Sequence, residues 1–257
     1  MIRFRPFLFA ALMLLSGHAA AEKFTIAAAA DLKFAMDEII ARYKQDHPAD
    51  MPQVIYGSSG KFHTQIQHNA PYDLYFSADI AYPRQLEQAG FAASPVRPYA
   101  LGRIVLWSAS IDASKLTLAS LAAPAIRRVA IANPRHAPYG KRAEEALRAS
   151  GLWAKVEPKL VYGENIAHAA QFVQTGNAQI GIIALALALN PVLSRQGGYW
   201  LIPDTLHEPL EQGFIVTRRA RDNAAAHRFA DYMGSAAARA VMAKYGFVLP
   251  GEAGKTR

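Results

Sequence analysis

Short apolar runs alternate with helical patterns along nearly the whole chain. Strands are predicted at 24–28 (FTIAA), 54–56, 73–77 (DLYFS), 104–108 (IVLWS), 129–132 (VAIA), 159–162, 180–183 (IGII) and 213–217 (GFIVT). Helical stretches separate most of these strands. Because strands that alternate with helices favour parallel sheets covered by helices, the pattern predicts an α/β fold. Ligands of such sheets bind beyond the carboxyl ends of the strands, where helices begin.

Three helices are predicted together with one of their ends. After Asp31, apolar residues recur at helical spacing, namely Leu32, Ala35, Met36, Ile39, Ile40 and Tyr43. Two more helices, at about 140–150 and 166–175, stop at Gly151 and Gly176, as helices commonly do. The proline-rich stretch SPVRPYALG (94–102) is the best candidate for a domain boundary.

The first 21 residues have the pattern of a secretory signal peptide. Arg3 and Arg5 precede an apolar run at 7–15, and the alanines at 19–21 supply the small residues for cleavage after Ala21. The apolar run is too short to span a bilayer. We therefore expect a protein that is exported and loses this segment.

The composition limits which cross-links or metals can stabilise the fold and which partners the chain can bind. The chain of 257 residues has no cysteine, which excludes a disulfide framework and a cysteine-bound metal. Its length suits two modest domains. The formal charge of +8 falls by two, to +6, when Arg3 and Arg5 leave with the signal peptide. The remaining basic residues are scattered, which suits the attraction of anions but gives no arm for nucleic acid.

Four junctions between a strand and a helix are suited to hold a small anion. VIYGSSGKF (54–62) places Gly57, Ser58, Ser59 and Gly60 where a strand ends and a helix begins. Similar junctions occur in AAAADLKF (27–34), ANPRHAPYGKRAEEAL (132–147) and VYGENIAHA (161–169). Each helix start offers unpaired backbone N–H groups at the positive end of the helix dipole. A single junction is explained as well by a serine that caps its helix, whereas four together predict an oxyanion site.

Enzyme motifs do not fit these junctions. A phosphate-binding loop requires glycine at position 55 and serine or threonine at position 62, where this chain has Ile55 and Phe62. The nucleophile elbow G-x-S-x-G is absent from the sequence. His63 and His68 are five residues apart, which misses the spacing of a helical metal site. We therefore expect no enzyme, no catalytic residues and no cofactor.

Five segments carry a family resemblance, and they follow one another in the family's order. They are AAAADLKFAMDEI, YGSSGKFHTQIQHNAPYDLYFSAD, ANPRHAPYGKRAEEAL, PKLVYGENI and AAARAVMAKYGF. These segments resemble the periplasmic molybdate-binding proteins, the receptors of molybdate ABC importers in the type II periplasmic binding protein superfamily. The resemblance covers essentially the whole chain after the signal peptide.

The resemblance implies a Venus-flytrap fold with two α/β lobes. Each lobe is expected to hold a mostly parallel sheet flanked by helices. The expected divisions are a signal peptide at 1–21, a first lobe at 22–102 and 214–257, and a second lobe at 103–213. Two crossover strands, at about 97–107 and 208–216, would act as the hinge of a domain closure.

The resemblance also implies a ligand and its partners. The ligand is molybdate or tungstate, a tetrahedral dianion held by neutral donors, with no protein atom bound directly to the metal. The family's contacts fall on Asp31, on Ser59 with Ser58 beside it, and on the backbone N–H groups of Tyr139 and Ile166. The expected partners are the permease and ATPase subunits of an ABC importer. The receptor is expected to be a monomer that binds no nucleic acid.

Two positions depart from the family pattern. Many relatives have serine in place of Asp31, and some have a tyrosine hydroxyl in place of Ala184. Sulfate, phosphate and chromate therefore remain open as ligands. A regulatory domain of the same fold is disfavoured by the signal peptide.

Asp31 raises an electrostatic problem. A carboxylate about 4 Å from a dianion would cost about 8 kcal/mol at an effective dielectric near 20. Either Asp31 turns away and caps its own helix, or the ligand carries a proton that Asp31 accepts. We expect the cap, because aspartate is among the most favourable N-cap residues.

Overall fold

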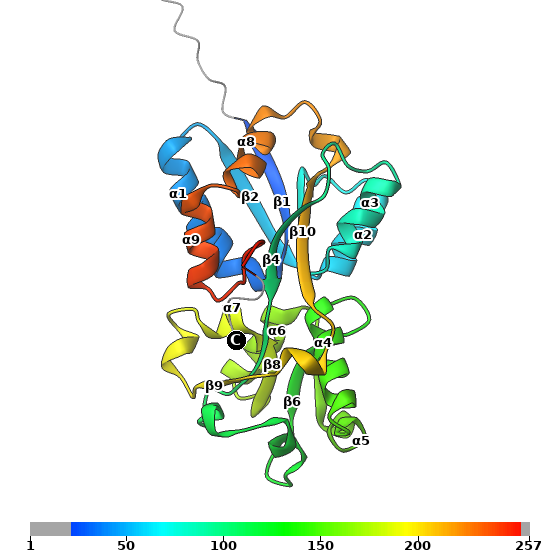
Figure 1. The fold of residues 1–257 in the computed structure, drawn as a ribbon, viewed down its shortest axis with the longest axis vertical. Helices are drawn as coiled ribbons and strands as arrows, with labels where there is room; N and C mark the ends of the chain where they lie inside the picture. The colour runs from blue at the N-terminus through cyan, green and yellow to red at the C-terminus, as the bar shows by residue number, and fades with distance from the viewer. Residues whose placement is uncertain (1–21, 253–257) are drawn as a thin grey trace, which may run out of the picture.

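The computed structural model describes residues 22–252, which form two lobes, one above the other in Figure 1. The predicted signal peptide, residues 1–21, lies outside the described residues. Each lobe is built around one five-stranded sheet with helices against its faces. No helix between residues 22 and 252 is both long and apolar enough to cross a membrane.

The first sheet has the order β2-β1-β3-β10-β4 and the second has the order β7-β6-β8-β5-β9. The strands are β1 (Lys23–Ala29), β2 (Met51–Gly57), β3 (Leu74–Ser77), β4 (Arg97–Gly102), β5 (Ile104–Trp107), β6 (Val129–Ala132), β7 (Leu160–Gly163), β8 (Ile180–Ala184), β9 (Tyr199–Leu201) and β10 (Leu210–Val216). The α-helices are α1 (Lys33–Asp46), α2 (Ser59–Gln67), α3 (Ala81–Gln88), α4 (Pro138–Ala149), α5 (Trp153–Val156), α6 (Ile166–Gln174), α7 (Leu185–Ala188), α8 (Ala224–Tyr232) and α9 (Ala236–Lys244). Short 3-10 helices are η1 (Ala30–Leu32), η2 (Ala113–Lys115), η3 (Leu118–Ala122), η4 (Glu157–Lys159), η5 (Leu193–Arg195), η6 (Asp204–Leu206) and η7 (Arg218–Ala220).

The two sheets share one pattern of strand direction. In the first sheet β1 is parallel to β2 and β3, while β10 is antiparallel to both of its neighbours, β3 and β4. In the second sheet β6 is parallel to β7 and β8, while β5 is antiparallel to β8 and β9. One strand in each sheet therefore runs against the other strands. The predicted α/β fold with mostly parallel sheets is confirmed.

Two segments connect the lobes. β4 ends at Gly102 in the first sheet, and β5 begins at Ile104 in the second. β10 returns the chain to the first sheet and runs beside β4 (Figure 1). Its pairing with β4 starts at Leu210, opposite Gly102, so the expected lobe boundary after residue 213 falls inside β10. The exact lobe boundaries stay a prediction.

The apolar runs of the sequence miss two strands, β4 and β9, of which the family resemblance implies only β4, as part of a crossover strand. The proline-rich stretch proposed as a domain boundary contains all of β4, and the chain passes to the second sheet directly after it. Pro98 is compatible with this strand because β4 lies at the edge of the first sheet, where a missing N–H leaves no neighbouring strand unpaired. β9 has only three residues and no buried one, so it carries no apolar run to recognise.

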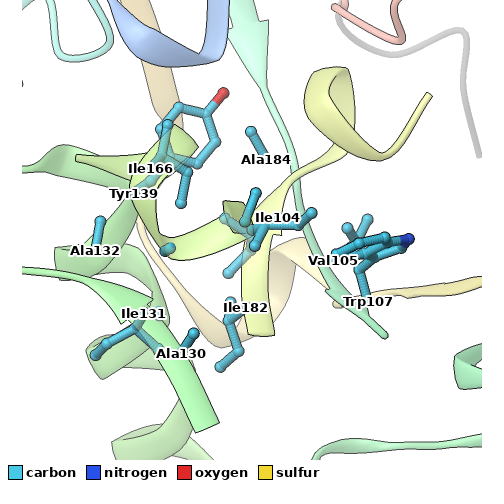
Figure 2. Packing of buried hydrophobic residues seen from close by; sticks show 14 of the residues in the cluster. Ile104, Val105, Trp107, Ala130, Ile131, Ala132, Tyr139, Ile166, Ile182 and Ala184 are labelled. Carbon is cyan, nitrogen blue, oxygen red and sulfur yellow. The ribbon is translucent and has the colours of Figure 1, made fainter. Parts of the chain in front are cut away.

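Each lobe has its own apolar core. The predicted stripe of α1 is buried at Ala35, Met36, Ile39 and Tyr43 against the first sheet. In the second lobe, Ile104 and Trp107 of β5 pack with Ile182 of β8 in the cluster shown in Figure 2. Tyr139 and Ile166 belong to the same cluster and are drawn at its upper end in Figure 2, where the tyrosine hydroxyl points away from the core. The second core therefore ends in two of the predicted site residues.

Candidate oxyanion site

The predicted site residues lie at four helix starts, two in each lobe. Asp31 is in η1, directly after β1, and Ser59 is the first residue of α2, directly after β2. Because Ala29 pairs with Gly57 at the ends of these strands, both helices start side by side. In the second lobe, α4 and α6 start side by side in the same way, because Ala132 at the end of β6 pairs with Gly163 at the end of β7.

Direct contacts bring the two pairs of helix starts face to face. The N–H of Gly60 in α2 donates to the carbonyl oxygen of His136, before α4, at 2.9 Å. The Ser58 hydroxyl donates to the same carbonyl oxygen and lies 2.9 Å from Nδ1 of His136. Lys61 and Glu164 form an ion pair across the same interface. The lobes are therefore closed against each other in this structure.

All five predicted site residues are buried in the closed structure. Asp31 and Ser59 are 1% exposed, and Ser58, Tyr139 and Ile166 are each 5% exposed or less. A ligand held among them would be removed from bulk water, which strengthens hydrogen bonds to its charge.

The predicted donors differ in how they are engaged. The Ser59 oxygen accepts a hydrogen bond from the N–H of Ala78 at 3.0 Å, which leaves its own proton to be donated. The N–H groups of Tyr139 and Ile166 lie in the first turns of α4 and α6, so they have no acceptor within their own helices. Ser58 is instead engaged with His136, which makes it a closure contact. Ala184 is buried at the end of β8 and adds no donor.

Asp31 joins both lobes through one oxygen of its carboxyl group. Its Oδ2 accepts hydrogen bonds from the Tyr139 hydroxyl and from Nε2 of Gln212, each at 2.9 Å. Nε2 of Gln212 also lies 3.0 Å from the Tyr139 oxygen. Because Tyr139 belongs to the second lobe and Gln212 to β10, this three-residue cluster ties the lobes together beside the strands that connect them.

The expected cap by Asp31 is wrong. The N-cap residues are Ala29 for η1 and Leu32 for α1, so Asp31 lies inside a 3-10 turn that precedes the α-helix. From there its side chain reaches across the interface to Tyr139. The reason is the extra turn, because it moves the start of α1 two residues beyond Asp31.

Burial dominates the electrostatics of Asp31. Desolvation raises the pKa of its carboxyl group from 3.8 to about 6, although the hydrogen bonds from Gln212 and Tyr139, and then the backbone N–H groups of Asp31 and Leu32, favour the ionised form. Burial, and then the charge of Asp31, hold the pKa of the Tyr139 hydroxyl well above its usual value, so this hydroxyl stays a donor. Within the described part of the chain, the buried Oδ1 of Asp31 has no hydrogen-bond partner.

Three contributing residues were not predicted from the sequence. Gln212 is fully buried within β10, and a polar residue next to the apolar run GFIVT was the available signal. Gly102 leaves room for the cluster of Asp31, Tyr139 and Gln212. A Cβ atom at this position would overlap the Tyr139 hydroxyl and lie 2.6 Å from Nε2 of Gln212. His136 contributes its backbone carbonyl, which no residue pattern identifies.

Comparisons with known proteins show which family and which relatives this chain is similar to. A family model described as a bacterial extracellular solute-binding protein matches residues 24–248. The molybdate-binding protein ModA of Azotobacter vinelandii is 35% identical over 237 residues, which cover 92% of this chain and 94% of that protein. The molybdate-binding protein ModA of Rhodobacter capsulatus is 35% identical over 198 residues, which cover 75% of each protein.

Solved structures extend the comparison to the fold. The periplasmic molybdate-binding protein of Azotobacter vinelandii superposes with a TM-score of 0.83 at 29% identity, covering 88% of this chain and 99% of that chain. The sulfate-binding protein SubI from Mycobacterium tuberculosis has a TM-score of 0.70 at 15% identity, covering 90% of this chain and 88% of that chain. The second likeness concerns the fold alone, so the fold does not select the oxyanion.

Proposed function

The chain belongs to the bacterial extracellular solute-binding proteins, and from that premise we propose that it is a periplasmic receptor for molybdate or tungstate. It binds the oxyanion between its lobes and delivers it to the permease and ATPase subunits of an ABC importer. It acts as a monomer and without catalysis. The convergence of four helix starts on one buried interface is the observation that carries this proposal.

Neutral donors are the chemical basis of the proposal. The Ser59 hydroxyl and the N–H groups of Tyr139 and Ile166 present partial positive charge without a lysine or arginine among them. Such donors bind an anion at helix N-termini. A dehydrated tetrahedral dianion has four oxygens to accept from these groups on both lobes, so its binding favours the closed form. Relatives named as molybdate-binding proteins, 35% identical to this chain, support molybdate over sulfate.

We expect molybdate and tungstate to raise the melting temperature of the protein far more than sulfate and phosphate do. A ligand at a thousand times its dissociation constant stabilises the folded state by about 4 kcal/mol. Differential scanning fluorimetry against these four oxyanions and chromate measures the ranking. If neither molybdate nor tungstate shifts the melt at millimolar concentration, the proposed ligand is wrong. A larger shift with sulfate, phosphate or chromate would identify the other oxyanion.

Replacing Ser59 with alanine is expected to weaken molybdate binding by about 10- to 150-fold, or roughly 1.5–3 kcal/mol, because a donor to a charged group is lost in a dry site. Isothermal titration calorimetry measures the change. Ser114→Ala, an exposed serine in η2 of the second lobe, is the matched control and should bind like the wild type. Equal affinity of Ser59→Ala and the wild type would remove Ser59 from the site.

A further inference from the structure

The carboxyl group of Asp31 has one oxygen that the contacts between the lobes leave unused. Oδ2 accepts from Tyr139 and Gln212, whereas Oδ1 is buried and lacks a partner among residues 22–252. A buried polar atom without a partner is costly to a folded protein. Oδ1 is therefore the atom of Asp31 that is left to contact a ligand, at the helix start where the oxyanion is proposed to bind.

Only one protonation state of Asp31 suits contact with a fully deprotonated dianion. An ionised carboxylate repels a dianion, and the low dielectric of a closed interface strengthens the repulsion. A protonated carboxyl group removes the repulsion and turns Oδ1 into an O–H donor. Two donors already hold Oδ2 as an acceptor, so the proton belongs on the other oxygen, Oδ1.

We propose that the oxyanion binds together with one proton, held between Asp31 Oδ1 and a ligand oxygen. This inference rests on the proposed function. For a fully deprotonated dianion, the proton comes from solvent and bonds to Oδ1. For a hydrogen oxyanion, the ligand brings the proton and Asp31 accepts its O–H as a carboxylate. Only O–H bonds form and break, and no electrons are transferred.

The groups around Asp31 decide which residue responds to pH. Tyr139 of α4 and Tyr99 of β4 have pKa values well above the usual one because of burial, so both stay neutral. Gln212 of β10 does not titrate. Other titratable groups on elements packed against η1 are Lys33, Asp37 and Glu38 in the first turns of α1, Tyr56 of β2 and His168 of α6. Desolvation, rather than any of these charges, is the largest cause of the raised Asp31 pKa.

His136 is the competing origin of a pH effect. Burial lowers its pKa, and its ring contacts Ser58 at the same interface, near Lys61 and Glu164. His136→Gln removes this titration but keeps the backbone carbonyl that accepts from Gly60. It is therefore the matched control for Asp31→Asn.

Proton counting tests the proposal on the wild-type protein. Titration calorimetry with molybdate, in pairs of buffers with different ionisation enthalpies, gives the number of protons taken up per ligand. With a carboxyl pKa of about 6 in the free protein, we expect about one proton at pH 7.5 and about a quarter of a proton at pH 5.5. The affinity should fall by up to about tenfold per pH unit above pH 6.5, because only the protonated fraction is competent.

The variants assign that proton to a residue. Asp31→Asn places an N–H donor where Oδ1–H is proposed, so it should bind molybdate without proton uptake and with constant affinity from pH 5.5 to 8. His136→Gln should keep the uptake of the wild type. Molybdate binding to the wild type without proton uptake at pH 7.5 would overturn this inference and leave the proposed function intact. Uptake that persists in Asp31→Asn would also overturn it. No molybdate or tungstate binding by the wild type would overturn both.

Discussion

Replacing Gly60 with alanine is expected to weaken oxyanion binding by about 5- to 150-fold, the equivalent of 1–3 kcal/mol of overpacking, because the bound protein needs the close contact between the lobes. A Cβ atom at this position would lie 2.7 Å from the carbonyl oxygen of His136 and 3.0 Å from the Tyr82 hydroxyl. The His136 carbonyl is backbone of the other lobe, so it yields only when the lobes separate. Neither lobe's own core is touched by the change.

Small-angle scattering and calorimetry together measure this effect. In saturating molybdate, Gly60→Ala should scatter as a less compact particle than the wild type does. Gly234→Ala is a matched control in the same lobe, because its Cβ atom would meet only the Asp231 carbonyl oxygen at an ordinary 3.4 Å. Wild-type affinity in Gly60→Ala would show that the lobes of the bound protein do not meet at this contact.

Asp31→Asn is expected to stabilise the ligand-free protein by up to about 3 kcal/mol at pH 7.5 and to have little effect near pH 4. The wild-type carboxyl has a pKa of about 6 when folded and 3.8 as its ordinary value. Between these values the folded state binds more protons than the unfolded state, so wild-type stability falls as pH rises and stays lower above pH 6. Asparagine is neutral throughout, and its side-chain oxygen still accepts from Tyr139 and Gln212.

Urea unfolding of both proteins at pH 4, 5, 6 and 7.5 measures the difference. Asp204→Asn changes an exposed aspartate and controls for the loss of one negative charge. A difference that does not grow with pH would mean that the Asp31 carboxyl is hydrated in solution, as it would be if the ligand-free lobes were open.

The sequence could predict the parts of this molecule that are local. The strand ends and helix starts that hold Asp31, Ser59, Tyr139 and Ile166 are visible as apolar runs, glycines and helical spacing within a few residues of each other. The role of the Asp31 side chain is not local, because its partners lie 108 and 181 residues further along the chain. An aspartate just before a helix predicts an N-cap. Only the contact between the lobes gives the Asp31 side chain different partners.

The same limit explains the other omissions. β4 contains Pro98, which its own sequence marks as unfavourable for a strand, and only the edge position in the sheet makes it acceptable. Gly102 is required because Tyr139 and Gln212 approach it from distant parts of the chain. Contacts between lobes combine segments whose pairing no local pattern encodes.

The place of β10 in the first sheet has a consequence for the order of folding. It fills the position between β3 and β4, yet it follows the whole of the second sheet in the chain. The second sheet uses one continuous stretch, residues 104–201, whereas the first cannot join β4 to β3 until residue 216 exists. Contacts between distant segments form slowly because loop closure must precede them. During synthesis β1, β2 and β3 therefore form an incomplete first sheet with the edge of β3 exposed. At that stage every strand of the second sheet has already been made.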